Sequence, residues 1–372
     1  MALARQVLSR ILPVRVYQAL AGFRRRQQRL LQQTLRARAM KSDAFSAFYA
    51  FVIDRGLGRE ARAVAAGQHR YHADHDAAAT SYFLLRRNIH RLEKGLIMRP
   101  RRDSFAADYI GETVRCYRNA YLELERTNRS ETPELAWATD VLGQYFSVVQ
   151  KDDPKIADAH EIFSKLAAIP LGHAVPYARD IAAPPPVSYD AFMSLCRRRR
   201  SVRWYLDKPV PRDMIDLAID AAAQAPSACN RQPFVFSIFD DKELARRVAK
   251  LPMGTKGFSD QIPAVAVVIG RLRAYPHSRD RHAIYIDGSL AAMSFMLALE
   301  SMGIASCTIN WPDQNPQETQ IAQLLGLAQD ERVIMLIAFG WPDPSGQVPY
   351  SAKRGRDELR TYNSLATQTS IQ

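Results

Sequence analysis

A run of arginines around residue 200 is the densest group of side chains that could do chemistry. Four consecutive arginines, Arg197 to Arg200, are followed by Ser201, and Arg203 lies two residues further on. Guanidinium groups present paired donors that match the oxygens of a phosphate monoester, and a hydroxyl adds one more donor. The run is consistent with a phosphate site, although a basic helix end in solvent, favoured by the helix dipole, produces the same pattern.

A second segment, residues 225–234, favours the ligand-binding interpretation. Its sequence, APSACNRQPF, directly follows an expected helix and leads into an expected strand. Small side chains in such a loop allow the backbone to approach a flat ligand closely. No GxGxxG follows an expected strand and neither GxxxxGKS nor GxxxxGKT occurs, so the sequence indicates neither a Rossmann dinucleotide site nor a P-loop.

Two ordered motifs resemble the opening signature of the FMN-dependent nitroreductase family. They are RRSVRWYLDKPV at 199–210 and QAPSACNRQPFVF at 224–236. Further likeness lies in FSDQIPAVAVVIG, in the helix around Asp287–Gly303, in ASCTINW and in IAFGWPDPSGQVPYSAKR. The resemblance covers 189–360 and implies an α+β fold, in which a mostly antiparallel central sheet is flanked by helices. Upstream, SYFLLRRNIHRLEKGLIMRPRR is similar to extensions of nitroreductase-like proteins encoded with polysaccharide-synthesis genes.

The resemblance implies a set of flavin-binding residues. Arg199, Ser201 and Arg203 match positions that bind the phosphate, the ribityl chain and the pyrimidine edge of FMN. A basic pair near the phosphate is matched by Lys353 and Arg354. The residues that align with the backbone approaching the isoalloxazine ring are Ile309 and Asn310.

A homodimer with shared flavin sites is also implied, because one loop of this family reaches the flavin across the dimer interface. The residues that match this loop are Pro226, Ser227, Ala228 and Asn230. Cys229 departs from the pattern, since glycine or another small residue is commoner at its position. The Cys229 thiol either lies near the flavin or only fills space.

The implied activity is flavin-dependent redox chemistry. NADH or NADPH would be the electron donor, and a small organic acceptor, nitroaromatic or quinone-like in vitro, would take the electrons. Because flavin N5 carries hydride transfer, the protein supplies position, shielding and electrostatics, and no catalytic acid or base is expected. Two alternatives stay open: oxidation of a biosynthetic intermediate such as a saccharide, and a non-catalytic, flavin-binding and membrane-associated assembly factor.

Histidines in the N-terminal half do not indicate a metal site. His69, His72 and His75, with Asp76, are spaced so that successive side chains rotate around a helix, and no second ligand cluster follows. We expect surface histidines and no bound metal.

Hydrophobic periodicity predicts the elements that must position these residues. The pattern from Asp43 to Ala168 is helical. In the C-terminal half, a first helix is expected to be N-capped by Ser188, and a second to begin at Asp213. The other expected helices are Ala78–Glu93, Tyr109–Arg126, Glu134–Val149 and Gly288–Met302. The expected strands are Phe234–Phe239, Val265–Ile269, Ala305–Ile309 and Val333–Phe339.

Consecutive prolines at 184–186 cannot continue a helix, because they lack amide donors, and we place a domain boundary there. The predicted division is a basic amphipathic arm at 1–41, a helical domain at 42–180, a Pro-rich linker at 181–188 and an FMN-binding domain at 189–372. The fold class is therefore α+β preceded by an all-α region.

Charge and composition limit location and partners. The net charge is +13, and the first 41 residues contain ten Lys or Arg and no acid. We interpret this arm as one or two amphipathic helices, broken at Pro13 and Gly22. Such helices could contact an anionic membrane or another polyanion, or act in organelle targeting. The alternative is that they are solvated or covered by a partner. No specific nucleic acid is expected. We expect a cytoplasmic location, with peripheral membrane contact as an option. The reasons are that the four cysteines are widely spaced, that the apolar stretches are too short to span a bilayer, and that there is no secretory h-region.

Overall fold

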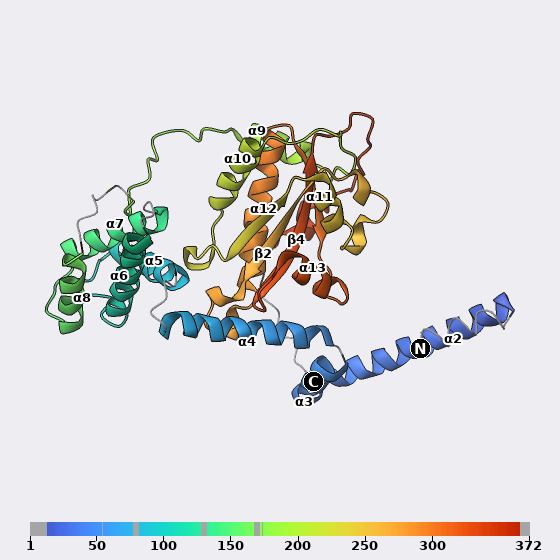
Figure 1. Ribbon diagram of the computed structural model, residues 1–372, viewed down its shortest axis with the longest axis horizontal. Helices are drawn as coiled ribbons and strands as arrows, with labels where there is room; N and C mark the ends of the chain where they lie inside the picture. Colours follow the sequence, from blue (N-terminus) through green and yellow to red (C-terminus); the bar gives the residue numbers. More distant parts are fainter. Residues whose placement is uncertain are drawn as a thin grey trace.

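The computed structural model describes residues 13–53, 55–76, 82–127, 132–166, 172 and 174–364. Figure 1 shows a cluster of helices beside a sheet domain, one helix running under that domain, and a long N-terminal helix extending away from it. An extended segment without helix or strand, residues 174–188, leads from the helical cluster to the sheet domain, as the prolines predict.

A four-stranded antiparallel sheet forms the centre of the C-terminal domain. Its strands are β1 Phe234–Phe239, β2 Ala264–Arg271, β3 Ala305–Asn310 and β4 Glu331–Gly340, in the order β1-β2-β4-β3. The predicted strands are confirmed, with β2, β3 and β4 longer than expected. Seven of the eight residues of β2 are buried, because helices cover both faces of the sheet.

The helices of this domain lie in two layers. Alternate residues of β2 face opposite layers: Val265 and Val267 pack in one core, Ala266 and Val268 in the other. The first layer contains α11 Lys242–Ala249 and α13 Gln317–Leu325, and the second contains α10 Arg212–Ala223 and α12 Ala283–Ser301. The remaining helices are α9 Tyr189–Arg198, N-capped by Ser188 as predicted, and the short α14 Arg356–Leu359. The predicted α+β class is confirmed.

Helix α12 is the longest apolar helix of the domain. The stretch Ser278–Ser301 is long and apolar enough to cross a membrane by length and composition, and 44% of its apolar window is buried in the protein. Ala291, Phe295 and Leu299 on α12 form part of the core beneath the sheet. We therefore interpret α12 as a core helix that begins five residues before its predicted start.

Four helices of the N-terminal half share a core of their own. They are α5 Tyr82–Leu96, α6 Ile110–Thr127, α7 Pro133–Val148 and α8 Pro154–Ser164. Thr132 and Asp153 cap α7 and α8 with their side chains, and each is followed by a proline at the first helical position, where no amide donor is needed. The helices predicted at 109–126 and 134–149 are confirmed, and the one predicted at 78–93 is seen from Tyr82 onward.

Helix α4, Arg55–Asp76, packs on the sheet domain instead of joining that cluster. Ala63 contacts a small core with Leu272, Tyr275 and Ile284. The fully buried Asp330 carboxylate accepts from Arg70 Nη1 at 3.0 Å and from Arg273 Nε at 2.6 Å. Residues 42–180 therefore do not share one core, although the division of the chain into domains stays a prediction.

In the described part of the basic arm, residues 13–41, there is one helix, α2 Val14–Ala39, which passes through Gly22 without a break. The predicted break at Gly22 is wrong, because one helical glycine costs only about 1 kcal/mol and its neighbours are good helix formers. Helix α3, Asp43–Phe48, and a π-helical turn at Tyr49–Ile53 follow. Residues 1–12 lie outside the described residues, and contact of the arm with an anionic membrane or another polyanion stays a prediction.

Substitution of Gly67 tests the docking of α4. A Cβ at Gly67 would lie 2.8 Å from the backbone carbonyl carbon of Leu272, whereas one at Gly58 on the same helix would lie 3.9 Å from its nearest neighbour, Phe51 Cδ1. We expect Gly67→Ala to lower the free energy of unfolding by about 1–3 kcal/mol and to speed hydrogen exchange across α4. The control, Gly58→Ala, gains helix propensity and stabilises by up to about 1 kcal/mol. Equal stability changes in chemical denaturation would contradict the close approach.

Candidate functional site

The arginine run lies at the β3 edge of the sheet. Helix α9 ends at Arg198, and the chain then runs extended beside β3, where Ser201 forms a parallel bridge with Ser306 and Val202 N donates to Ser306 O at 3.1 Å. The segment therefore acts as a short addition to the sheet, and this pairing fixes the positions of Arg199, Ser201 and Arg203.

The electrostatics of this group fit an anion. Arg199 and Arg203 are half-buried, and no described carboxylate lies within ion-pairing distance of either guanidinium. Arg203 lies over the Phe258 ring at 5.7 Å and donates to Ser201 O at 3.3 Å. Burial raises the pKa of the Cys307 thiol, and Arg203 and Arg199 oppose that rise, which places both cations near the same point. Ser306 Oγ is buried without a hydrogen-bond partner among the described residues.

The C-terminal tail brings the second basic pair to the same side. Arg200 Nη2 donates to Pro349 O at 2.8 Å, and Lys353 and Arg354 follow four and five residues later. The structure separates the two predicted residues: Arg354 pairs with Glu358 at 3.1 Å, whereas Lys353 is exposed and has no ion pair with a described residue. Lys353 is the better candidate of the two for a ligand phosphate.

The loop at 226–232 adopts a conformation that glycine normally takes. Cys229, Asn230 and Gln232 have φ of 54°, 51° and 49°, in the left-handed region that non-glycine residues rarely enter. Ser227 Oγ accepts from Gln232 N at 3.0 Å, which closes the loop on itself. The departure noted at Cys229 therefore has a structural meaning: the backbone there has the geometry for which glycine is favoured.

Asp287 on α12 anchors this loop, and sequence reasoning missed its role. Its Oδ2 accepts from Ala228 N at 3.1 Å and from the Tyr275 hydroxyl at 2.8 Å. Burial raises the pKa of Asp287, and the hydrogen bonds from Tyr275 and Ala228 oppose that rise. The signal was present in the sequence, because Asp287 is the one charged residue in the largely apolar stretch from Ala283 to Leu299.

Arg86 on α5 is the second residue that sequence reasoning missed. Its Nε donates to Asn230 O at 2.7 Å and its Nη2 to Gln232 Oε1 at 2.9 Å, while Nη1 lies 3.3 Å from Glu134 Oε1. Burial lowers the pKa of Arg86, and Glu134 opposes that change. The helical cluster therefore holds the loop from outside the sheet domain.

Two further predicted residues lie at the end of β3. The Ile309 side chain is buried in the core under α11 and α13 and is therefore not available to a ligand. Asn310 is exposed and lies on the same face of β3 as Thr308. Pro226 and Ala228 are likewise exposed, so three of the predicted residues, Pro226, Ala228 and Asn310, are open to a ligand.

The two groups of predicted residues do not meet within one chain. Ala228 contacts α12 at Asp287, and Arg198, next to the first group, donates to Glu300 at 2.8 Å near the other end of α12. Asp287 and Glu300 are thirteen residues apart on one helix, so their Cα atoms are separated by about 20 Å. Residues 13–364, as far as they are described, contain no group of three or more His, Cys, Asp or Glu that could hold a metal.

A model described as the nitroreductase family matches residues 196–256 and 252–341. Residues 196–341 are a nitroreductase-family domain. The match includes the arginine run, the loop at 226–232, the sheet and α12, and it ends before the C-terminal tail. The resemblance inferred from the motifs is therefore confirmed for this domain, while α2 to α8 lie outside the match.

Several characterised proteins are similar to this nitroreductase-family domain. Iodotyrosine deiodinase 1 of Rattus norvegicus is 22% identical over 45% of this chain and 68% of that protein, and iodotyrosine deiodinase of Hydra vulgaris is 22% identical over 56% of this chain and 86% of that protein. Among solved structures, an FMN-dependent nitroreductase from Clostridium difficile is 22% identical, with a TM-score of 0.40 over 46% of this chain and 99% of that chain.

Substitution of Cys229 tests the left-handed loop. A β-branched residue at φ 54° clashes with its own backbone, so we expect Cys229→Val to lower the free energy of unfolding by about 1–2 kcal/mol. Cys229→Gly should leave stability unchanged or raise it. Chemical denaturation of both variants is the measurement, with Cys196→Val in helix α9 as the control for loss of a thiol. Equal effects of the valine and glycine substitutions would contradict the strained conformation.

Proposed function

We propose that this protein is an FMN-dependent oxidoreductase that takes hydride from NADH or NADPH and passes electrons to a small organic acceptor. The observation that carries the proposal is the half-buried pair Arg199 and Arg203, which lacks a described carboxylate partner and flanks Ser201 in a nitroreductase-family domain. Unpaired, partly buried cations are costly unless a ligand neutralises them.

The residues present fit FMN. Guanidinium forks of Arg199 and Arg203, the Ser201 hydroxyl and Lys353 supply donors for a phosphate and for the negative edge of a flavin ring. Bound FMN would supply two-electron hydride chemistry at its N5. The chain itself would bind and orient the ring and place positive charge from Arg203 where negative charge develops. No side chain is assigned as a catalytic acid or base.

We further propose a homodimer that completes each flavin site. The exposed face of α12 carries Ile286, Leu290 and Met293, which are 59%, 44% and 40% exposed and follow each other at helical spacing. This apolar stripe begins beside Asp287 and extends toward Glu300. A two-fold axis through the stripe would place the 226–232 loop of one copy beside the arginine run of the other.

Screening of acceptors assigns the acceptor class. Nitroaromatics and quinones are convenient acceptors, and the names of the deiodinase relatives add iodinated tyrosines to the compounds to be tested. Oxidation of a biosynthetic intermediate uses the same cofactor in the opposite direction. Bound FMN that NADPH fails to reduce would favour that alternative.

The visible spectrum of the purified protein tests flavin binding and reduction together. We expect a flavin spectrum that bleaches on anaerobic addition of NADPH, and an Arg199→Ala, Arg203→Ala variant with at least about tenfold weaker FMN affinity, because two charge-assisted contacts are lost. Arg212→Ala, an exposed arginine paired with Asp240, is the matched control. A colourless wild type that FMN does not reconstitute would overturn the proposal.

Charge on the exposed face of α12 tests the dimer. We expect wild type to be dimeric by light scattering, and Ile286→Glu, Leu290→Glu to be monomeric and poor in FMN, because buried carboxylates at an apolar interface are strongly unfavourable. Leu244→Glu, at an exposed position on α11, should remain dimeric and flavin-bound. A monomeric wild type that retains FMN would sink the shared-site model.

A further inference from the structure

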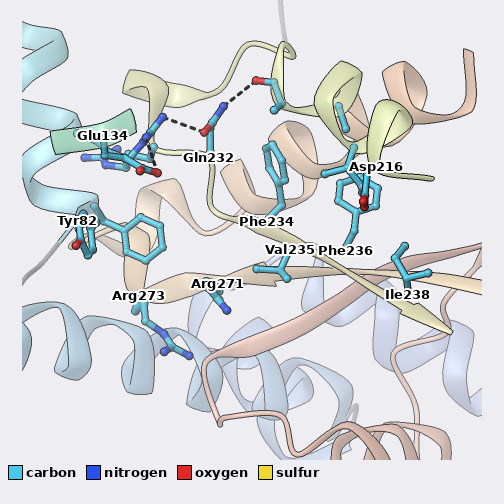
Figure 2. A pocket seen from close by; sticks show the side chains of 16 residues that line it. Tyr82, Glu134, Asp216, Gln232, Phe234, Val235, Phe236, Ile238, Arg271 and Arg273 are labelled. Atoms are coloured by element: carbon cyan, nitrogen blue, oxygen red, sulfur yellow. Dashed lines mark hydrogen bonds and ion pairs between the residues drawn. The ribbon is translucent and has the colours of Figure 1, made fainter. Parts of the chain in front are cut away.

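A cavity of about 720 Å³ lies between the helical cluster and the sheet domain. Tyr82, Phe83, Arg86 and Glu134 line it from the side of the cluster, and β1 and α10 line it from the side of the domain. Figure 2 shows Phe234, Val235, Phe236 and Ile238 along β1 among the lining residues, with Gln232 just before the strand. Helix α5 contacts the 226–232 loop through Arg86, and the cavity lies between α5 and the edge strand β1.

The walls of the cavity are largely apolar. Phe83, Phe234, Phe236, Ile219 and Ile238 all lie in its lining. Pockets that hold small organic ligands have this composition and size, with a few polar groups that fix orientation. An apolar or aromatic body would therefore be accommodated along the β1 edge.

Three of the four arginines in the lining are already neutralised. Arg271 Nε lies 3.1 Å from Glu331 and Arg273 Nε lies 2.6 Å from Asp330. Arg86 lies 3.3 Å from Glu134. These ion pairs leave little of their charge for a ligand.

Arg231 is the exception. It is only 6% exposed, its guanidinium has neither an ion pair nor a hydrogen bond to any described residue, and its Nε is fully buried. The guanidinium stacks 4.7 Å from the Tyr275 ring, which holds it in place without neutralising it. The Asp287 carboxylate acts on Arg231 at longer range, but its Oδ2 accepts from Ala228 and Tyr275. A buried cation with no acceptor is unfavourable, so the site has the electrostatic character of an anion site.

We propose that this cavity binds a small organic acid, with its carboxylate on Arg231 and an aromatic or apolar body along β1. The cavity is separate from the arginine run, because Arg231 lines the space under α5 while the run lies at the opposite edge of the sheet. Arg231 also lies between Asn230 and Gln232, the two residues that Arg86 contacts, so an occupant adjoins the loop that we assign to the flavin. The proposed anion site does not depend on flavin binding.

Calorimetric titration of the full-length protein with 2-naphthoate and with the neutral isostere 2-naphthamide tests this proposal. We expect saturable binding of naphthoate and at least about tenfold weaker binding of naphthamide, because only the acid forms a charge-assisted pair with Arg231. Arg231→Gln should remove the preference for the acid, whereas Arg212→Gln on the surface of α10 should keep it.

A second pair of variants locates the bound acid. Ala223→Trp, at an exposed position that lines the cavity, should abolish naphthoate binding, and Gln224→Trp, exposed and outside the lining, should not. This pair decides the question even if Arg231→Gln fails to fold. Equal affinity for acid and amide, no saturable binding at millimolar concentration, or naphthoate binding that survives Ala223→Trp would each overturn the proposal. Loss of binding in the Arg199→Ala, Arg203→Ala variant would place the acid in the flavin site instead and would likewise overturn it.

Discussion

The arrangement of the candidate site depends on the burial of the Asp287 carboxylate within an apolar helix. A buried carboxylate needs donors, and here the Tyr275 hydroxyl and the Ala228 amide supply them. The chain that carries this amide then passes through three left-handed residues, Cys229, Asn230 and Gln232, none of which is glycine. The backbone strain of the loop, of order 1 kcal/mol or more per residue, is thus offset by satisfying a group that would otherwise be unpaired in the core.

Helix α12 contacts both the loop and the segment next to the arginine run, and its length separates the two. Its Asp287 end holds the loop, and its Glu300 end holds Arg198 beside the arginine run. The helix is rigid and central to the core, so neither group can approach the other within one chain. The helical cluster adds a further constraint, because Arg86 of α5 donates a hydrogen bond to the same loop. Arg86 also lines the cavity beside that loop. The N-terminal half therefore forms part of the surroundings of the loop through Arg86.

Local features were predictable from the sequence, and contacts between distant segments were not. The alternation of apolar residues gave β1 with its observed bounds, and Ser188 was correctly placed as a cap. Helix α12 was placed five residues late, because Asp287 interrupts the apolar pattern without ending the helix. The docking of α4 depends on Gly67 meeting Leu272, and the Arg86 contact joins residues 144 positions apart. Nothing in local periodicity encodes such pairs. The arginine run could be identified because its members are adjacent, whereas its separation from the loop depends on the path of α12.

Mixed dimers measure the central claim, that each flavin site combines the arginine run of one copy with the loop of another. One copy would carry Arg199→Ala and Arg203→Ala, the other Ala228→Trp at the exposed tip of the loop, and differently tagged copies would be purified together after co-expression. Each variant alone should bind little FMN, while the mixed dimer should recover about half of the wild-type flavin per chain, because one of its two sites is intact. A mixed dimer that binds no FMN would contradict the account and would place the whole site within a single chain.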